Sequence, residues 1–499
     1  MNYNNKILDE YDSLFEERKQ KILNSKSDFV IKGTTYYVSN CGDDNNDGRT
    51  PENPWKTLKK VSEAYLNEGD GVLFKRGDLF RGTVKTKSGV TYSAYGEGAK
   101  PMFYGCHKPL SSPELWEIYD EKHNIWKCKE KMLDPGTIVF NDGEFHSRKL
   151  IPSYNDKMQF VCRDDESRLF KVENEMTEDL DVYWHYDETL TKVPTKGKNF
   201  PIPLIGDNSF GDIYLRCDKG NPGEVFESIE SLARTHIFFV GANKNVTIDN
   251  VCIKYAGMHG VSAGGYSVGL HVTNCEIGWI GGSIQHYGGT DPNYPQGGRG
   301  TVTRFGNGIE IYGGCDDYIV SNNYIYQIYD AGVTHQITTS HKVTMTNISY
   351  VDNLIERCVY GIEYFLDQIN GEDESYMDNV VIKNNFIRLG GYGWGQQRHN
   401  KETPALIKGW SYKNTAKKYS ILNNIFDRCR YRLLHLVALK KNSLPEMNHN
   451  VYIQNVGGML GQYGENENGE PKIITFDENT EETIKYVFKD ERAKVVLIN

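Results

Sequence analysis

Five short segments in the second half of the chain share a pattern that places side chains on one face of a sheet. Each segment is typical of a short strand, and alternation turns its central apolar residue inward. The segments are HGVSA (259–263), NGIEI (307–311), AGVTH (331–335), YGIEY (360–364) and YRLLH (431–435). The residues predicted to point outward are Ser262, Glu310, Thr334, Glu363 and Leu434. Two glutamates are therefore expected on one exposed sheet face.

The spacing of these carboxylates fits acid/base chemistry. Rungs of a parallel sheet lie ~4.8 Å apart, so the backbones of Glu310 and Glu363, with the Thr334 rung between them, should lie roughly 10 Å apart. Asp330, at the bend before Gly332, adds a carboxylate on the intervening rung. Carboxyl pairs about 6.5 to 9.5 Å apart suit inverting glycoside hydrolysis, and pairs about 5 to 5.5 Å apart suit the retaining mechanism. We predict Asp330, Glu363 and Glu310 as catalytic residues, against the alternative of merely solvated glutamates.

Two long insertions are expected to wall this face, because insertions in a solenoid project from one side. They are residues 283–306 and 388–410. The predicted substrate contacts are Thr334, His335, Tyr364, Tyr392, Trp394, Gln396, Gln397, Arg398, His399 and Lys408, and the other loop aromatics are Tyr287, Tyr294 and Trp410. Strict alternation turns His335 and His435 inward. We expect His435 in the core, whereas a bend at Asp330 would expose His335.

A sequence repeat predicts the architecture that carries this face. Each repeat contains a short run of β-branched residues, an asparagine or aspartate, and an apolar residue. The repeated polar positions are Asn250, Asn274, Asn322, Asp352, Asn384 and Asn423. Such residues tolerate left-handed turns, and their side chains can hydrogen-bond along a solenoid axis. Coils of about 22 to 24 residues with inserted loops explain the spacing. We therefore assign these positions to structure and predict a parallel β-helix.

Composition supports an all-β chain and excludes several classes of function. The 499 residues include 49 glycines, and aromatic residues make up 12%, which suits many short strands. The net charge of −10 and the lack of a Lys/Arg cluster argue against nucleic-acid binding. The sequence contains no nucleotide-binding glycine motif, no HExxH and no CxxC. We expect no metal and no cofactor, apart from calcium if the chain is a lyase.

The N-terminal sequence carries charges and no apolar run typical of a signal peptide. No stretch approaches 18 consecutive apolar residues, so no membrane partner is expected. The ten cysteines are scattered, which favours reduced, buried thiols in a cytoplasmic protein. The oligomeric state stays open.

The expected organisation has five parts. They are an N-terminal docking or capping helix (1–32), the start of the β-helix (33–105), an inserted β-rich subdomain (106–235), the main coils with groove loops (236–465) and a C-terminal cap segment (466–499).

Three segments resemble known β-helix proteins. The region around TTYYVSNCGDDNNDGRTPENPWKTL (34–58), with SGVTYSAYGEGAKPMFYG (88–105), resembles the opening of polysaccharide lyases and glycoside hydrolases of the pectate-lyase-like superfamily. IYLRCDKGNPGEVFESIE (213–230) resembles a segment of β-helix glycosidases that include β-xylosidase families. The resemblance implies a right-handed parallel β-helix whose open end is plugged by a helix, near residues 55–65.

Three functional hypotheses follow. The leading one is a glycoside hydrolase that cleaves plant- or microbe-derived oligosaccharides with a carboxylic acid and a carboxylate. The second is a polysaccharide lyase, with Arg398, Lys408 or His335 as the base and calcium on Asp316 and Asp317. The third is a non-catalytic carbohydrate-binding β-helix, which would not need stacked carboxylates.

Overall fold

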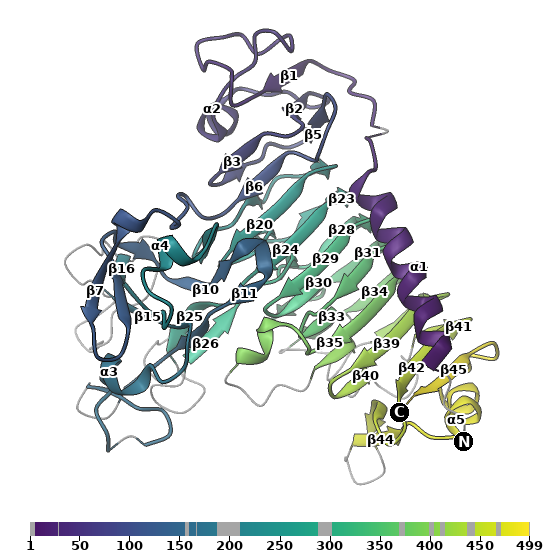
Figure 1. Cartoon of the computed structure of the whole chain (residues 1–499). Helices are drawn as coiled ribbons and strands as arrows, with labels where there is room; N and C mark the ends of the chain where they lie inside the picture. The colour runs from purple at the N-terminus through teal and green to yellow at the C-terminus, as the bar shows by residue number, and fades with distance from the viewer. Residues whose placement is uncertain are drawn as a thin grey trace.

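The structure is a computed structural model that describes residues 5–27, 29–154, 159–165, 167–186, 210–287, 302–368, 375–398, 404–409, 415–436, 445–465 and 471–498. Its main body is a right-handed parallel β-helix, as predicted, in which three long sheets run side by side along the solenoid (Figure 1). Apolar side chains from all three sheets fill one continuous interior.

The first sheet begins in the N-terminal segment and continues through the coils. Its strands, in spatial order, are β1 (Thr35–Val38), β2 (Gly71–Lys75), β5 (Thr91–Tyr95), β19 (Thr247–Asp249), β23 (His271–Thr273), β28 (Cys315–Ser321), β31 (Thr344–Val351), β34 (Tyr376–Lys383), β38 (Tyr419–Leu422) and β41 (Glu446–Asn448). His271 pairs with Ile319. The 48-residue interval between Asn274 and Asn322 is therefore a single coil with an insertion, as expected.

The second sheet runs beside the first. Its strands are β11 (Phe145–His146), β10 (Pro135–Phe140), β17 (Ile229–Ala233), β20 (Cys252–Ala256), β24 (Glu276–Ile280), β29 (Tyr324–Ile328), β32 (Leu354–Glu356), β35 (Phe386–Gly390), β39 (Ile425–Cys429), β42 (Val451–Asn455) and β45 (Lys494–Ile498). β3 (Leu79–Arg81) and β6 (Met102–Tyr104) extend it at its N-terminal side.

The third sheet contains the segments that carry the predicted carboxylates. Its strands are β4 (Val84–Lys85), β18 (Phe238–Gly241), β21 (Val261–Ala263), β27 (Ile309–Ile311), β30 (Ala331–Thr339), β33 (Tyr360–Gln368), β36 (Ala405–Gly409), β40 (Arg432–Leu436), β43 (Met459–Glu465) and β44 (Pro471–Thr475). Parallel pairing stacks β18 through β43, and β44 closes the sheet as an antiparallel strand.

The inserted subdomain projects from the side of the solenoid (Figure 1). Its sheet has the order β12 (Arg148–Leu150), β15 (Asp181–Tyr186), β16 (Phe210–Arg216), β8 (Ile125–Cys128) and β7 (Trp116–Asp120). Trp116, Trp184 and Leu215 belong to its separate core. The expected segment 106–235 is not entirely separate, however, because β10 and β17 lie within the second sheet of the solenoid.

Two helices cover different parts of the β-helix. α2 (Leu58–Glu63) buries Leu58 and Val61 against the first coils, near the position of the expected plug. α1 (Asn5–Leu23) instead lies along the outside of the solenoid (Figure 1). Phe15 packs against Tyr324 and Phe386 of the second sheet, so this helix docks on the side of the coils rather than closing an end.

Two adjacent polar positions of the repeat have different structural roles: the first forms a left-handed turn, and the second forms a buried hydrogen-bonded ladder. The six predicted positions all have positive φ, between 54° and 59°, which asparagine and aspartate tolerate better than most residues. The continuous buried ladder lies one residue later, and this corrects the expectation. Asn323 donates to Asn353 at 3.0 Å, Asn353 to Asn385 at 2.9 Å and Asn385 to Asn424 at 3.0 Å.

Nine of the ten cysteines are buried and free, whereas Cys41 is free and exposed, which departs from the expectation. None of the helices in the described part of the chain combines the length and apolarity that a bilayer crossing requires.

Candidate active site in the groove of the third sheet

The pairing register of the third sheet defines which side chains share its outer face. Ser262 pairs with Glu310, Thr334 with Glu363, and Glu363 with Lys408. Lys408 then pairs with His435. The expected column is therefore confirmed up to Glu363, but its last member was wrong. β36 supplies a rung that the sequence pattern omitted, and His435, not Leu434, continues the face.

Glu310 occupies a buried polar pocket on this face. Its side chain accepts hydrogen bonds from Thr334 Oγ1, at 3.0 Å, and from the Asn307 amide. Burial raises the pKa of Glu310 to about 7, while these two hydrogen bonds oppose the shift. Neighbouring Asp330 and Glu363 add to the rise. Close to neutral pH, Glu310 can therefore hold or release a proton.

Asn307 and His259 complete the surroundings of Glu310. Asn307 Oδ1 accepts from the backbone N–H of Ala331 at 2.8 Å, which turns its amide nitrogen toward Glu310. His259 Nδ1 accepts from the Asn307 backbone at 2.9 Å and lies 4.0 Å from Glu310 Oε2. Burial lowers the pKa of His259 well below its usual value, so the ring is neutral and carries its proton on Nε2. His236 stacks on it at 5.3 Å.

These two residues were not predicted, although the sequence contained the signal. His259 and Asn307 both precede the glycine of their segments, HGV and NGI, and Val261 pairs with Ile309. They therefore occupy equivalent positions on adjacent rungs.

Asp330 lies at the start of the next rung and forms an ion pair with Arg398. The two side chains are only 15% and 12% exposed, respectively. Burial raises the pKa of Asp330, and the Arg398 guanidinium opposes that rise. Arg398 also lies 5.6 Å from the centre of the Tyr329 ring. The cation thus supports the charged form of the carboxylate.

Glu363 lies between Thr334 and Lys408 on the sheet face and forms an ion pair with the lysine. Lys408 Nζ lies 2.8 Å from Glu363 Oε1 and 4.0 Å from the centre of the Tyr360 ring. His435 follows on the next rung, and burial together with Arg432 and Lys408 lowers its pKa to about 3. His435 is therefore a neutral member of the groove face, which corrects its expected place in the core.

Three predicted substrate contacts lie in packed interiors instead. His335 is fully buried, with Nδ1 2.7 Å from the Tyr350 hydroxyl, and its ring stacks on Tyr364 at 5.2 Å. Strand alternation carries both rings into the solenoid core. The Trp394 indole N–H donates to the Gln327 carbonyl at 2.8 Å, and its ring packs on Tyr329. None of these three side chains offers a surface to a sugar.

The remaining predicted contacts differ in their placement. Thr334 and Lys408 lie on the groove face, and Tyr392 is 46% exposed. Gln396 and Gln397 belong to η3 (Trp394–Gln397) beside the inserted subdomain. His399, Tyr294, Trp410 and the side chain of Tyr287 lie outside the described residues.

The calcium-binding role considered for Asp316 and Asp317 finds no support in their contacts. Both lie on β28 of the first sheet, where Asp316 Oδ1 accepts from the Thr346 backbone at 2.8 Å and Asp317 Oδ1 accepts from Asn347 at 2.8 Å. Among the described residues, no three His, Cys, Asp or Glu side chains gather as a metal site.

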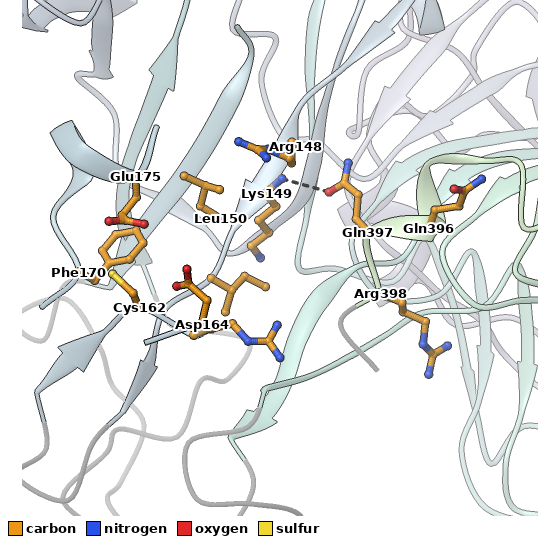
Figure 2. Close-up of a pocket in the computed structure, with 12 residues that line it drawn as sticks. Arg148, Lys149, Leu150, Cys162, Asp164, Phe170, Glu175, Gln396, Gln397 and Arg398 are labelled. Carbon is orange, nitrogen blue, oxygen red and sulfur yellow. Dashed lines mark hydrogen bonds between the residues drawn. The ribbon is translucent and has the colours of Figure 1, made fainter. Parts of the chain in front are cut away.

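A cavity of about 740 Å³ opens between the inserted subdomain and η3. Figure 2 shows residues of β12 and its neighbours on one side and Gln396, Gln397 and Arg398 on the other. Arg398 therefore belongs both to the wall of this cavity and to the ion pair with Asp330.

Comparison with known proteins adds a distant sequence relationship. No family model matches the chain. A lacto-N-biosidase of Bifidobacterium longum subsp. longum is 33% identical over 137 residues, which cover 25% of this chain and 8% of that protein. The chain thus spans a small part of the length of this curated relative.

Solved structures with a similar β-helix share little sequence with the chain. A GH136 lacto-N-biosidase from Eubacterium ramulus has 14% identity and a TM-score of 0.42, covering 92% of this chain and 60% of that one. XylC in complex with xylose has 13% identity and a TM-score of 0.37, covering 87% and 68%. The chain is a right-handed parallel β-helix, a quarter of which is similar in sequence to a lacto-N-biosidase.

Proposed function

We propose that this protein is a glycoside hydrolase in which Glu310 acts as the general acid. The proposal is carried by the arrangement of three carboxylates on consecutive rungs of one sheet. Asp330 and Glu363 are each paired with a cation, whereas no lysine or arginine within the described residues pairs with Glu310. Environments that separate the proton affinities of neighbouring carboxyl groups are how acid and base roles are divided.

The chemistry follows from this division. Protonated Glu310 donates its proton to the glycosidic oxygen as the bond to the anomeric carbon breaks. Asp330, paired with Arg398, or Glu363, paired with Lys408, attacks the anomeric carbon or activates a water molecule. The positive charge that develops on the sugar ring is stabilised by the same carboxylates. No step requires a metal ion.

The relatives suggest which sugars to offer first. One group comprises lacto-N-biosidases, and XylC was solved with xylose. We therefore propose oligosaccharides built from such units as substrates.

The test is release of 4-nitrophenol from 4-nitrophenyl β-xyloside and 4-nitrophenyl β-lacto-N-bioside, with and without EDTA. We expect release that EDTA does not change, and a loss of activity in Glu310→Gln that is larger on an alkyl glycoside than on these aryl glycosides, because 4-nitrophenolate departs with little protonation. Glu356→Gln is the matched control, because Glu356 is a buried glutamate of the second sheet that bonds Tyr324 and Arg388 away from the groove. Calcium-dependent formation of unsaturated products from polygalacturonate would indicate a lyase instead. Sugar binding without turnover of any substrate would indicate a binding protein.

A further inference from the structure

The cavity between the inserted subdomain and the β-helix is built from two walls of different origin. The subdomain contributes Leu150, Phe170 and Asp164, and η3 with the residue after it contributes Gln397 and Arg398. In Figure 2 the Arg398 side chain extends away from the subdomain. Its guanidinium reaches Asp330 in the groove. The cavity and the carboxylate cluster therefore share one residue as a common boundary.

The two walls are joined by the amide of Gln397. Gln397 Nε2 donates to the Ser147 carbonyl at 2.7 Å, and the Lys149 backbone N–H donates to Gln397 Oε1 at 3.1 Å. Both contacts involve backbone groups of the subdomain, so they fix the position of η3 against it. Since Arg398 follows directly, the subdomain also positions the cation that pairs with Asp330.

The lining of the cavity combines apolar surface with charges that already have partners. Phe170 and Leu150 supply apolar surface. Arg148 is paired with Asp181 at 2.7 Å, and Lys149 with Asp134. Because these charges are neutralised by partners within the protein, the cavity wall offers hydrogen-bond donors and acceptors but no strong net electrostatic field. Such a wall suits the hydroxyl groups and the apolar face of a neutral sugar better than it suits an ion.

The size of the cavity agrees with a sugar ligand. Sites for small molecules have volumes of roughly 300 to 1,000 Å³, and the cavity measures about 740 Å³. The volume is sufficient for a sugar ring with its substituents, and Arg398 marks the side on which the cavity adjoins the carboxylate cluster.

We propose that this cavity binds a second, neutral sugar unit of the substrate, adjoining the unit whose glycosidic bond is cleaved at the carboxylate cluster. The inserted subdomain is then a specificity element that makes the enzyme prefer disaccharide glycosides to monosaccharide glycosides. This inference rests on the proposed hydrolase function.

The test compares matched substrates that differ by one sugar unit. The pairs are 4-nitrophenyl β-xyloside with β-xylobioside, and 4-nitrophenyl β-N-acetylglucosaminide with β-lacto-N-bioside. Phe170→Ala and Asp164→Ala remove one apolar and one polar contact from the cavity wall. Losing one such contact is expected to lower kcat/KM for the preferred bioside about tenfold, and to lower that of its monoside much less. Asp164 is an exposed residue, so its removal leaves the subdomain core intact.

Two controls are matched to these variants. Phe145→Ala removes an exposed phenylalanine of β11, outside the cavity, and Asp165→Ala removes the carboxylate next to Asp164. Both should retain wild-type kinetics on both members of each pair. Equal losses for monoside and bioside in the two cavity variants, or unchanged kinetics in both, would overturn the inference.

A binding measurement separates this inference from the proposed function. Calorimetric titration of Glu310→Gln with lacto-N-biose and xylobiose should detect binding that Phe170→Ala and Asp164→Ala weaken. Wild-type enzyme that hydrolyses no glycoside would contradict the hydrolase function, while cavity-dependent binding of a disaccharide would still support the site. Hydrolysis without cavity-dependent binding would sustain the function and reject the site.

Discussion

The hydroxyl of Thr334 lies 3.0 Å from Oε2 of Glu310, on the neighbouring rung of the third sheet. This hydrogen bond favours the charged carboxylate, whereas burial favours the neutral acid. The balance places the pKa of Glu310 at about 7. Because a general acid must be protonated to act, kcat/KM should fall as the pH rises through about 7.

Removing the Thr334 hydroxyl should shift the pH at which kcat/KM falls on the alkaline side. Thr334→Val removes a hydrogen bond to the charged form, so the pKa of Glu310 should rise and the alkaline limb of kcat/KM should shift upward by about one pH unit. The profile of an alkyl glycoside measured from pH 5 to pH 10 checks this. Thr338→Val, on the exposed part of the same strand, should leave the limb in place. A downward shift in Thr334→Val would contradict the assignment.

The raised pKa of Glu310 also predicts a pH-dependent cost in stability. The folded-state pKa of about 7 lies above the ordinary value of 4.5 for a glutamate. The favourable contribution of the protonated group is therefore complete below pH 4.5 and is lost as the pH rises through 7. Glu310→Gln should therefore become more stable relative to the wild type between these pH values, by on the order of 3 kcal/mol. Urea unfolding at pH 4.5 and pH 8 measures the difference. An equal difference at both pH values would argue against it.

The ion pair of Asp330 and Arg398 predicts that substitutions at these two residues have strongly coupled effects on stability. Arg398→Met leaves a largely buried carboxylate without its cation, which costs on the order of 3 kcal/mol. Adding Asp330→Asn removes the charge and should restore most of the thermal stability without restoring turnover. Thermal unfolding and kinetics of both single variants and the double variant give the coupling. Additive effects on stability would show that the pair is not coupled.

The repeat made the architecture predictable because its side chains obey local rules. Asparagine or aspartate at a left-handed turn and an inward apolar residue after it are dictated by backbone geometry. The buried ladder was placed one residue too early, however. Asn322 and Asn323 are adjacent and chemically identical, and only the three-dimensional path of the turn decides which amide points into the solenoid.

The buried asparagine ladder predicts that substitutions at two neighbouring positions differ greatly in their effect on stability. Asn353 bonds Asn323, Asn385 and the Val320 carbonyl inside the solenoid. Asn353→Ala strands several buried polar groups and should lower the free energy of unfolding by about 3 kcal/mol or more. Asp352→Gly keeps the left-handed turn and should change it by less than about 1 kcal/mol. Urea unfolding of both variants measures this, and similar losses would contradict the role of the ladder.

The site was predictable only where it follows the strand register. Glu310, Thr334 and Glu363 could be aligned because their segments share a glycine and an alternating pattern. His435 was misplaced because its segment, YRLLH, lacks that glycine. β36 was missed because it lies within residues 388–410, which were predicted to be an insertion. His335 and Tyr364 could not be separated from the groove by composition alone, since only the observed alternation carries them into the core.

The division of roles among the carboxylates is tested most directly by varying the leaving group. Glu310→Gln should lose on the order of 10²- to 10⁴-fold in kcat/KM on an alkyl glycoside, whose departing oxygen needs a proton. The same variant should retain most of its activity on the corresponding glycosyl fluoride, whose leaving group needs little protonation. Equal loss on both substrates, with a folded protein, would contradict the assignment of Glu310 as the general acid.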